Sequence, residues 1–314
     1  RGMKRLFALV FAFATAFAQP SEDASTLVGR LLLLAFPGSE APLERLAEFQ
    51  PGGFLLYPSN VPSGESLRSL TATLQDAASY PLLFGIDQEG GPFSSYRPAD
   101  AALFPGQMAL AATGEPSLAE AVGEASGRGL AALGVNLVFG PVADVMNNPD
   151  NPIIGVRSFG ANPEAVAAFA VAYAAGLDEG GVAAVAKHFP GHGDTAQDSH
   201  LELPTVAADL ARLERVELAP FRALVAAGVP GIMTAHIVFP ALDAAAPATL
   251  SSAVLSGLLR EDLGFSGLVV TDFMDMAAIA QNYGAGEAAV SSVLAGADLV
   301  LLGPDLNRQR EVHA

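Results

Sequence analysis

Eight short apolar segments, separated by stretches of helical character, constrain the fold of this chain more than any other feature. They comprise residues 28–35, 53–57, 82–86, 135–139, 182–186, 231–235, 268–271 and 299–302. Several are continuously apolar rather than alternating, as expected of parallel strands that are covered on both faces. Eight successive strand–helix units predict an α/β fold, a (β/α)8 TIM-type barrel, more readily than an open doubly wound sheet.

The intervening stretches are rich in alanine and leucine and predict helices over residues 63–78, 116–132, 163–178, 209–227 and 251–263. Asn162 followed by Pro163 is typical of a helix N-terminus. Residues 303–314 follow the last predicted strand and do not form an ordinary amphipathic pattern. We therefore expect the closing helix of the barrel to be absent or truncated. No linker divides residues 19–314, which are expected to form a single catalytic domain.

The first eighteen residues have a different character. Lys4 and Arg5 precede an apolar run over residues 6–17, and Ala16-Phe17-Ala18 is a small-x-small cleavage pattern. This arrangement predicts a signal peptide over residues 1–18 and an exported protein, periplasmic or secreted. The run is too short for a comfortable membrane span, so no stable span is expected after cleavage. A buried N-terminal helix is the alternative.

Composition excludes several classes of function. The chain has 33 acidic and 16 basic residues, a formal net charge of −17, and a surface this acidic repels the phosphates of nucleic acids. It has no cysteine, which rules out disulfides, thiolate zinc sites and cysteine nucleophiles. Neither a G-x-S-x-G elbow nor a P-loop is present.

The densest polar segment runs from Lys187 to His200, and Lys187 is the only lysine beyond the predicted signal peptide. His188 and His192 have the spacing of a zinc-binding helix, but the Pro-Gly pair between them predicts a loop and makes that geometry improbable. Asp198 and His200, two residues apart, suit a carboxylate–imidazole pair that transfers protons.

Further candidates lie where predicted strands end, which in a barrel is the active-site face. Asp272 follows the seventh apolar segment, and Asp87 follows the third in the sequence Asp-Gln-Glu-Gly-Gly. Arg157 offers a fixed fork of donors. Asp144 and His236 also end strands, and for both a structural role is as plausible as ligand contact. For Asp272 the alternative is a cap on the following turn. Such a mouth suits a polyhydroxylated ligand.

The motifs KHFPGHG with DSH (187–200), DQEGG (87–91), NPIIGVRSFG (151–160), TAH (234–236) and TDFMDM (271–276) together resemble glycoside hydrolase family 3. The resemblance is strongest to its single-domain bacterial β-N-acetylglucosaminidases. It implies that Asp272 is the nucleophile and that His200, paired with Asp198, is the general acid/base. It further implies that the sugar is held by Asp87, Arg157, Lys187 and His188.

The resemblance also implies a retaining exo-β-N-acetylglucosaminidase that acts on peptidoglycan fragments or chito-oligosaccharides, without metal or cofactor. One alternative is a β-glycosidase or a phosphorylase with another sugar preference, because a neutral histidine base repels phosphate less than a carboxylate would. A catalytically inactive glycan-binding barrel and a metal-dependent hydrolase are the others.

Two departures from the family pattern concern the site. Pro92 stands where a basic residue usually follows the two glycines, and Arg97 comes five residues later. Near the nucleophile, the usual pair of aspartates is replaced by Asp272-Phe273, with Asp275 three residues on.

Overall fold

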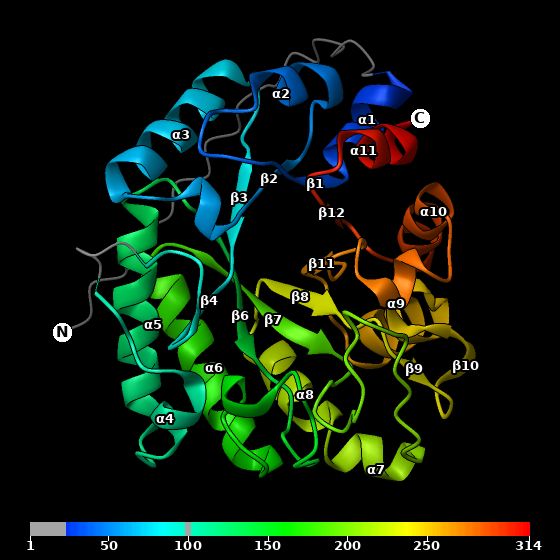
Figure 1. The fold of residues 1–314 in the computed structure, drawn as a ribbon. Helices are drawn as coiled ribbons and strands as arrows, with labels where there is room; N and C mark the ends of the chain where they lie inside the picture. The colour runs from blue at the N-terminus through cyan, green and yellow to red at the C-terminus, as the bar shows by residue number, and fades with distance from the viewer. Residues whose placement is uncertain (1–22, 98–101) are drawn as a thin grey trace, which may run out of the picture.

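The computed structural model describes residues 23–97 and 102–314; the predicted signal peptide therefore lies outside the described residues. Eight parallel strands form one sheet, and their order in the sheet follows their order in the chain. These strands are β1 Leu32–Ala35, β2 Gly53–Leu56, β3 Leu83–Ile86, β6 Leu137–Val142, β7 Ala183–Phe189, β8 Gly231–Thr234, β11 Leu268–Val270 and β12 Val300–Leu302. The predicted (β/α)8 barrel is confirmed (Figure 1).

The seam between β11 and β12, the two ends of the sheet order, nearly closes the barrel. The amide of Thr271 donates to the carbonyl of Leu299 at 2.9 Å, and the amide of Leu299 donates to that of Val269 at 3.1 Å. Side chains supply further acceptors: Thr271 Oγ1 accepts from the amide of Leu301 at 2.9 Å, and Asp298 Oδ2 from that of Val269 at 2.8 Å. The seam thus combines backbone bonds with bonds to two side chains.

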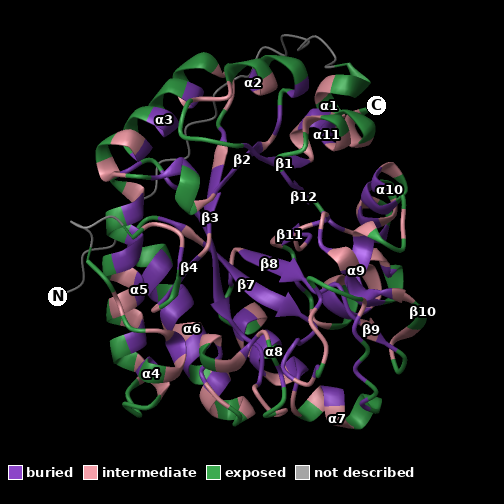
Figure 2. Ribbon diagram, in the orientation of Figure 1, coloured by how far each residue is buried: buried purple, intermediate pink, exposed green. Residues whose placement is uncertain are grey.

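The core has two parts, because alternate strand residues point to opposite faces. One cluster fills the barrel with Leu33, Ala35, Leu55, Leu137, Phe139, Val185, Met233, Val270, Leu299 and Leu301. Their strand neighbours, such as Leu32 and Leu34, belong to the larger cluster between the sheet and the helices. Gly85 in β3 makes room inside, since a Cβ there would lie 2.7 Å from the ring of Phe139. Figure 2 shows the buried strands enclosed by helices whose outer faces are exposed.

The helices are α1 Ala24–Arg30, α2 Leu43–Phe49, α3 Gly64–Ala77, α4 Gln107–Ala111, α5 Pro116–Ala131, α6 Pro163–Glu179, α7 Leu210–Arg215, α8 Leu218–Ala226, the π-helix η4 Ala253–Asp262, α9 Ala277–Ala280, α10 Ala285–Ala295 and α11 Leu306–His313. Single 3₁₀ turns are η1 Pro58–Asn60, η2 Gly155–Arg157 and η3 Ala248–Leu250. Asn162 caps α6 as predicted, since its side chain accepts from the amide of Ala165 at 2.7 Å.

Two short hairpins project from the sheet. They consist of β4 Gln88–Gly90 with β5 Phe93–Ser94, and of β9 Val238–Phe239 with β10 Asp243–Pro247. Among the described helices, none combines the length and apolar character that crossing a membrane requires.

Three elements differ from the sequence-based expectations. The apolar run 28–35 begins in helix α1, which starts early because Asp23 caps it by accepting from the amide of Thr26. The stretch 209–227 divides into α7 and α8. Pro220 near the start of α8 lacks an amide hydrogen, so a single helix across this point would lose a hydrogen bond.

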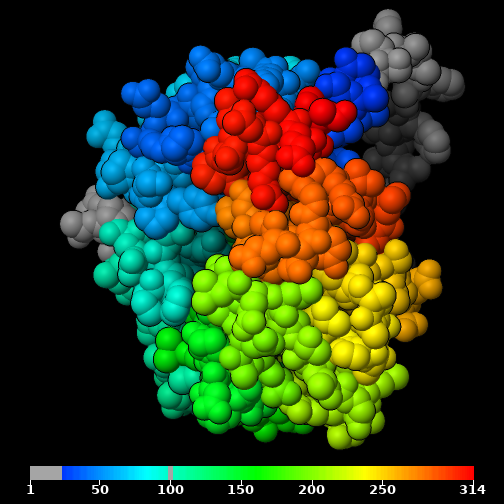
Figure 3. Space-filling view, turned by 45° about the vertical axis from the view of Figure 1, so that its right-hand side comes forward, coloured from blue at the N-terminus to red at the C-terminus, as the bar shows by residue number. Residues whose placement is uncertain are grey.

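The closing helix, expected to be absent or truncated, is present as the short helix α11. Asp305 caps it by accepting from the amides of Asn307 and Arg308 at 2.8 and 3.1 Å. Arg308 Nε lies 2.9 Å from Asp275 Oδ1, which ties the helix to the segment after β11. In Figure 3 the C-terminal residues (red) lie between the N-terminal elements (blue) and the α9–α10 region (orange). Of the two alternatives, complete absence is therefore wrong, and the structure has a short closing helix.

Candidate active site

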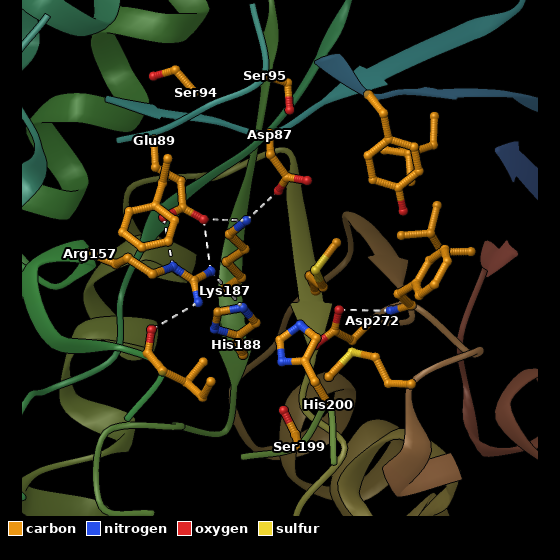
Figure 4. Close-up of a pocket in the computed structure, with 18 of the residues that line it drawn as sticks. Asp87, Glu89, Ser94, Ser95, Arg157, Lys187, His188, Ser199, His200 and Asp272 are labelled. Atoms are coloured by element: carbon orange, nitrogen blue, oxygen red, sulfur yellow. Dashed lines mark hydrogen bonds and ion pairs between the residues drawn. The ribbon is translucent and has the colours of Figure 1, made fainter. Parts of the chain in front are cut away.

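A pocket of about 510 Å³ opens at the carboxyl ends of the strands. Charged and polar side chains from β3, β4, β7, β11 and the loops that follow them point into it (Figure 4). Its lining includes Tyr57, Asp87, Glu89, Phe93, Arg97, Arg157, Lys187, His188, His192, His200, Met233, Asp272, Phe273 and Met276. This edge of the barrel is the one at which the sequence predicted the chemistry.

Four charged side chains form a connected cluster on one side of the pocket. Glu89 in β4 accepts two hydrogen bonds from Arg157, from Nε and Nη2, both at 2.8 Å. Lys187 Nζ lies 2.7 Å from Glu89 and 2.5 Å from Asp87, so the ammonium bridges the two carboxylates (Figure 4). The Glu89 and Lys187 side chains are each only 3% exposed, whereas that of Asp87 is 38% exposed. Asp87 is therefore the carboxylate of this cluster that solvent or a ligand reaches.

Electrostatics keeps Glu89, Lys187 and Arg157 charged. Burial alone would raise the pKa of Glu89, but the Lys187 ammonium and the Arg157 guanidinium outweigh it and hold that pKa at about 2. Burial likewise disfavours the two cations, yet Glu89 and Asp87 raise the pKa of Lys187, and Glu89 raises that of Arg157. The cluster presents fixed donors and one accessible carboxylate, a set suited to sugar hydroxyls.

Asp144, shortly after β6, fixes the positions of His188 and His192 by hydrogen bonds. It is fully buried and accepts from His188 Nδ1 at 2.7 Å and from the amide of His192 at 2.6 Å. His188 Nε2 is thereby directed toward the pocket, where it lies 3.4 Å from Arg157 Nη2. Burial raises the pKa of Asp144, but His188 more than compensates and the net pKa is lowered. Asp144 supports the site without lining the pocket.

Asp272 follows β11 and is partly buried on the pocket wall. Its carboxylate accepts from the amide of Phe273 at 2.7 Å, and its own amide donates to Thr234 Oγ1 at 3.3 Å. Burial would raise the pKa of this carboxyl, but the nearby His188 and His236 rings and the Phe273 amide lower it overall. An ionised carboxylate whose orientation is fixed by a hydrogen bond from a backbone amide is in the state required of a nucleophile.

His200 lies at the end of the loop that follows β7. Its Nδ1 lies 2.8 Å from Asp198 Oδ1, which also accepts from the His200 amide at 2.8 Å. The His200 side chain is 57% exposed, and its ring points into the pocket on the side of Asp272 (Figure 4). The predicted carboxylate–imidazole pair is thus formed, with Nε2 left for a ligand.

The structure brings most of the predicted site residues together on the lining of this pocket: Asp87, Arg157, Lys187, His188, His200 and Asp272. Asp198 stands behind His200 rather than on the lining. His236 is fully buried against Thr249 and the Phe273 carbonyl, which favours the structural alternative. Pro92 and Arg97, the departures from the family pattern, both line the pocket.

Sequence reasoning did not assign two residues the roles that they have in the site. Glu89 was considered as part of the Asp-Gln-Glu-Gly-Gly strand end and as a substitute proton donor if His200 lacked that role, yet it is the carboxylate that holds both Arg157 and Lys187. His192 is buried, with Nδ1 3.0 Å from Thr195 Oγ1 and Nε2 3.0 Å from Ser199 Oγ. Burial, and then the nearby His188, lower its pKa to about 4, so the ring is neutral. It joins the two ends of the loop.

The histidines do not gather as metal ligands. No group of three or more His, Cys, Asp or Glu side chains within residues 23–97 and 102–314 has an arrangement that could hold a metal ion. His188 and His192 instead contact each other edge to face, with ring centroids 5.6 Å apart.

Comparison with known proteins places this geometry in a family. Residues 27–311 match the Glycosyl hydrolase family 3 N terminal domain. The chain is 39% identical over 279 residues to beta-hexosaminidase A of Pseudoalteromonas piscicida, covering 82% of this chain and 47% of that protein. It is 37% identical to a beta-hexosaminidase of Neisseria meningitidis serogroup B, covering 87% of this chain and 78% of the other.

Solved structures give the same result. A glycoside hydrolase family 3 beta-N-acetylglucosaminidase from Paenibacillus superposes with a TM-score of 0.91 at 44% identity, over 93% of this chain and 57% of that one. NagZ from Neisseria gonorrhoeae, solved with N-trifluoroacetyl-D-glucosamine, superposes with a TM-score of 0.82 at 33% identity, over 90% and 84% of the two chains. The chain thus spans about half the length of the Pseudoalteromonas and Paenibacillus proteins.

Proposed function

Because the chain belongs to glycoside hydrolase family 3, we propose that it is a retaining exo-β-N-acetylglucosaminidase that hydrolyses terminal N-acetyl-β-D-glucosaminides. Its substrates are peptidoglycan fragments or chito-oligosaccharides. One observation carries the proposal: a single pocket is lined by an ionised strand-end carboxylate, Asp272, by a histidine with its own carboxylate partner, His200, and by the charged cluster around Glu89. The names of the related hexosaminidases support the choice of sugar.

The charged cluster is suited to bind the terminal sugar. Asp87 and His188 Nε2 accept hydrogen bonds from sugar hydroxyls, while Lys187 and Arg157 donate to them. Because Glu89 neutralises and fixes these two donors, they keep their positions when no ligand is bound.

Asp272 and His200 then share the reaction in two steps. In the first step Asp272 attacks the anomeric carbon, the glycosidic bond breaks, and His200 protonates the departing oxygen. In the second step His200 removes a proton from water, which attacks the anomeric carbon and releases Asp272 and the sugar. Asp198 orients the imidazole and stabilises its protonated form, which gives up a proton in the first step and is regenerated in the second.

A panel of aryl β-glycosides that differ only in the C2 substituent tests the sugar assignment. The N-acetylamino compound should be turned over faster than the 2-hydroxy compound by at least about tenfold, since a lost contact in a polar site costs 1–2 kcal/mol. Equal rates would favour a β-glycosidase of broader preference, and binding without any turnover would favour the inactive glycan-binding barrel.

A slow 5-fluorinated N-acetylglucosaminide tests the nucleophile. It should label Asp272, as shown by peptide mass mapping, and Asp272→Ala should lose turnover while keeping its far-UV circular dichroism spectrum. Label on another carboxylate, or normal turnover by the variant, would overturn the assignment.

We also propose that the protein is exported, on the basis of the predicted signal peptide over residues 1–18. The proposal rests on the sequence alone: a basic start, an apolar run and a small-x-small site before Gln19. Expression of the intact chain in a Gram-negative host, followed by cell fractionation and N-terminal sequencing, provides the test. A mature protein that begins near Gln19 outside the cytoplasm is expected, and a cytoplasmic protein with residues 6–17 still attached would refute export.

A further inference from the structure

The loop that carries Asp198 and His200 rests on a buried glutamate outside the pocket lining. Glu217 lies between α7 and α8, and its side chain is only 1% exposed. The backbone of Gly191 packs directly upon it: a Cβ at Gly191 would lie 2.9 Å from Glu217 Cβ, and φ there is +144°. The start of the loop is therefore in direct contact with Glu217.

Polar contacts extend this packing into a continuous network. Glu217 Oε1 accepts from Asn147 Nδ2 at 2.9 Å and from Arg212 Nη2 at 3.2 Å. The same Arg212 Nη2 lies 2.8 Å from Asp194 Oδ2, a carboxylate of the loop itself. Arg212 thus bridges the buried Glu217 and the loop. We refer to Asn147, Glu217, Arg212 and Asp194 as the loop anchor.

The loop anchor connects to His200 through the buried ring of His192. In the sequence, His192 lies between Gly191 and Asp194. His192 Nδ1 lies 3.0 Å from Thr195 Oγ1, and its Nε2 lies 3.0 Å from Ser199 Oγ. Ser199 immediately precedes His200. Fixing the backbone around His192 therefore fixes Ser199, and with it the start of the turn that presents the His200 imidazole.

We propose that Arg212 and Glu217 are positioning residues: they hold the loop so that His200 stands over the pocket in reach of the glycosidic oxygen. The inference rests on the proposed role of His200 as general acid/base. The anchor is asymmetric, because Glu217 is buried while the Arg212 and Asp194 side chains are 37% and 23% exposed. The link between Arg212 and the loop is thus the part that water and salt reach.

The same pair of helices supplies a matched control. Glu214 in α7 and Arg222 in α8 form an exposed ion pair, with side chains 39% and 42% exposed. Neither contacts the loop in any hydrogen bond or ion pair of the described residues. Like Arg212→Gln, Arg222→Gln removes a cation from the pair of helices α7 and α8. Unlike Arg212→Gln, it leaves the loop anchor intact.

Hydrogen exchange tests the anchor without reference to catalysis. Peptides covering residues 195–200 should exchange severalfold faster in Arg212→Gln and in Asp194→Asn than in the wild type or in Arg222→Gln. Asp194→Asn alters only a partly exposed loop residue, so it stays informative even if a change at Glu217 prevents folding. Unchanged exchange in both anchor variants would overturn the proposal.

Kinetics with two aryl N-acetylglucosaminides then tests positioning. Misplaced acid catalysis should lower kcat for a poor leaving group on the order of tenfold in Arg212→Gln. KM for that substrate, and the rate of the burst with an activated leaving group, should change less than about twofold, because neither depends on protonation of the leaving oxygen. Equal losses for both leaving groups, or losses matched by Arg222→Gln, would make Arg212 merely structural. If the wild type cleaves neither substrate, the proposed function fails while the exchange result still decides the anchor.

Discussion

Replacing Glu89 by glutamine should destabilise the protein strongly, although Glu89 has no assigned role in the reaction. A carboxyl whose pKa is held at about 2 instead of 4.5 favours the folded state by on the order of 3 kcal/mol at neutral pH. Glutamine removes the charge and leaves Arg157 and Lys187 buried with one carboxylate fewer, a defect that typically costs about 3–5 kcal/mol. The two routes agree on a loss near 3 kcal/mol, equivalent to a Tm lowered by about 5 °C for a chain of this length.

The stability that the Glu89 charge provides should decrease as the pH falls. Because the pKa of Glu89 is depressed in the folded state, its contribution is complete above pH 4.5 and is lost as the pH falls toward 2. The difference in unfolding free energy between wild type and Glu89→Gln should therefore shrink by roughly 1 kcal/mol between pH 7 and pH 3.5. Urea unfolding followed by circular dichroism is the assay, since the chain has no tryptophan for fluorescence.

Glu261→Gln is the control, because Glu261 is exposed near the end of η4, and its effect should stay within about 0.5 kcal/mol. A Glu89→Gln variant as stable as the wild type would refute the reasoning. So would a stability difference that is the same at pH 7 and pH 3.5, since the loss would then arise from packing rather than charge.

Other expectations concern the loop and its support. His200→Ala should lose about 10²–10⁴-fold in rate with poor leaving groups but react with activated ones in a burst, and azide should accelerate its turnover; no rescue would move the proton transfer elsewhere. Asp198→Asn should show the same pattern more mildly. Asp144→Asn should lose about 3 kcal/mol in urea unfolding, because Asp144 supports His188 and His192; unchanged stability would contradict this. EDTA should leave initial rates unchanged, and recovery with zinc after a loss would revive a metal site.

The barrel was predictable because its signal is local: apolar runs recur eight times along the chain, with alanine- and leucine-rich helical stretches between them. Strand-end residues such as Asp272 and Asp87 followed from that topology, since parallel strands bring their carboxyl ends to one face. Glu89 was not predictable in the same way. Its role depends on the hairpin β4–β5, which turns its side chain toward Arg157 and Lys187, 68 and 98 residues further along the chain.

Helix details failed for a related reason. The stretch 209–227 divides at Glu217, where the two helices meet. The role of Glu217 is visible only in its contact with Gly191 of the loop, which is distant in the sequence. In the run 28–35, Arg30 separates Val28 and Gly29 from the apolar residues 31–35, and this first part is too short for its periodicity to distinguish the end of a helix from a strand. Long-range packing supplied the information at Glu217, and the cap at Asp23 marks the helix that precedes β1.

The seam of the barrel bears on which substitutions this chain tolerates. Most other strand pairs are joined by backbone groups, which every residue type except proline provides in full, although the Asn136 side chain also bonds to Phe84 and Leu82 where β3 meets β6. Between β11 and β12 the side chains of Thr271 and Asp298 accept from backbone amides, so closure there depends on residue identity. A saturation library should therefore be intolerant at these two positions, even to substitutions of similar size such as Thr271→Val. Thr271 directly precedes Asp272, so the same short segment closes the barrel and positions the nucleophile. A substitution at Thr271 should therefore affect both stability and the placement of Asp272.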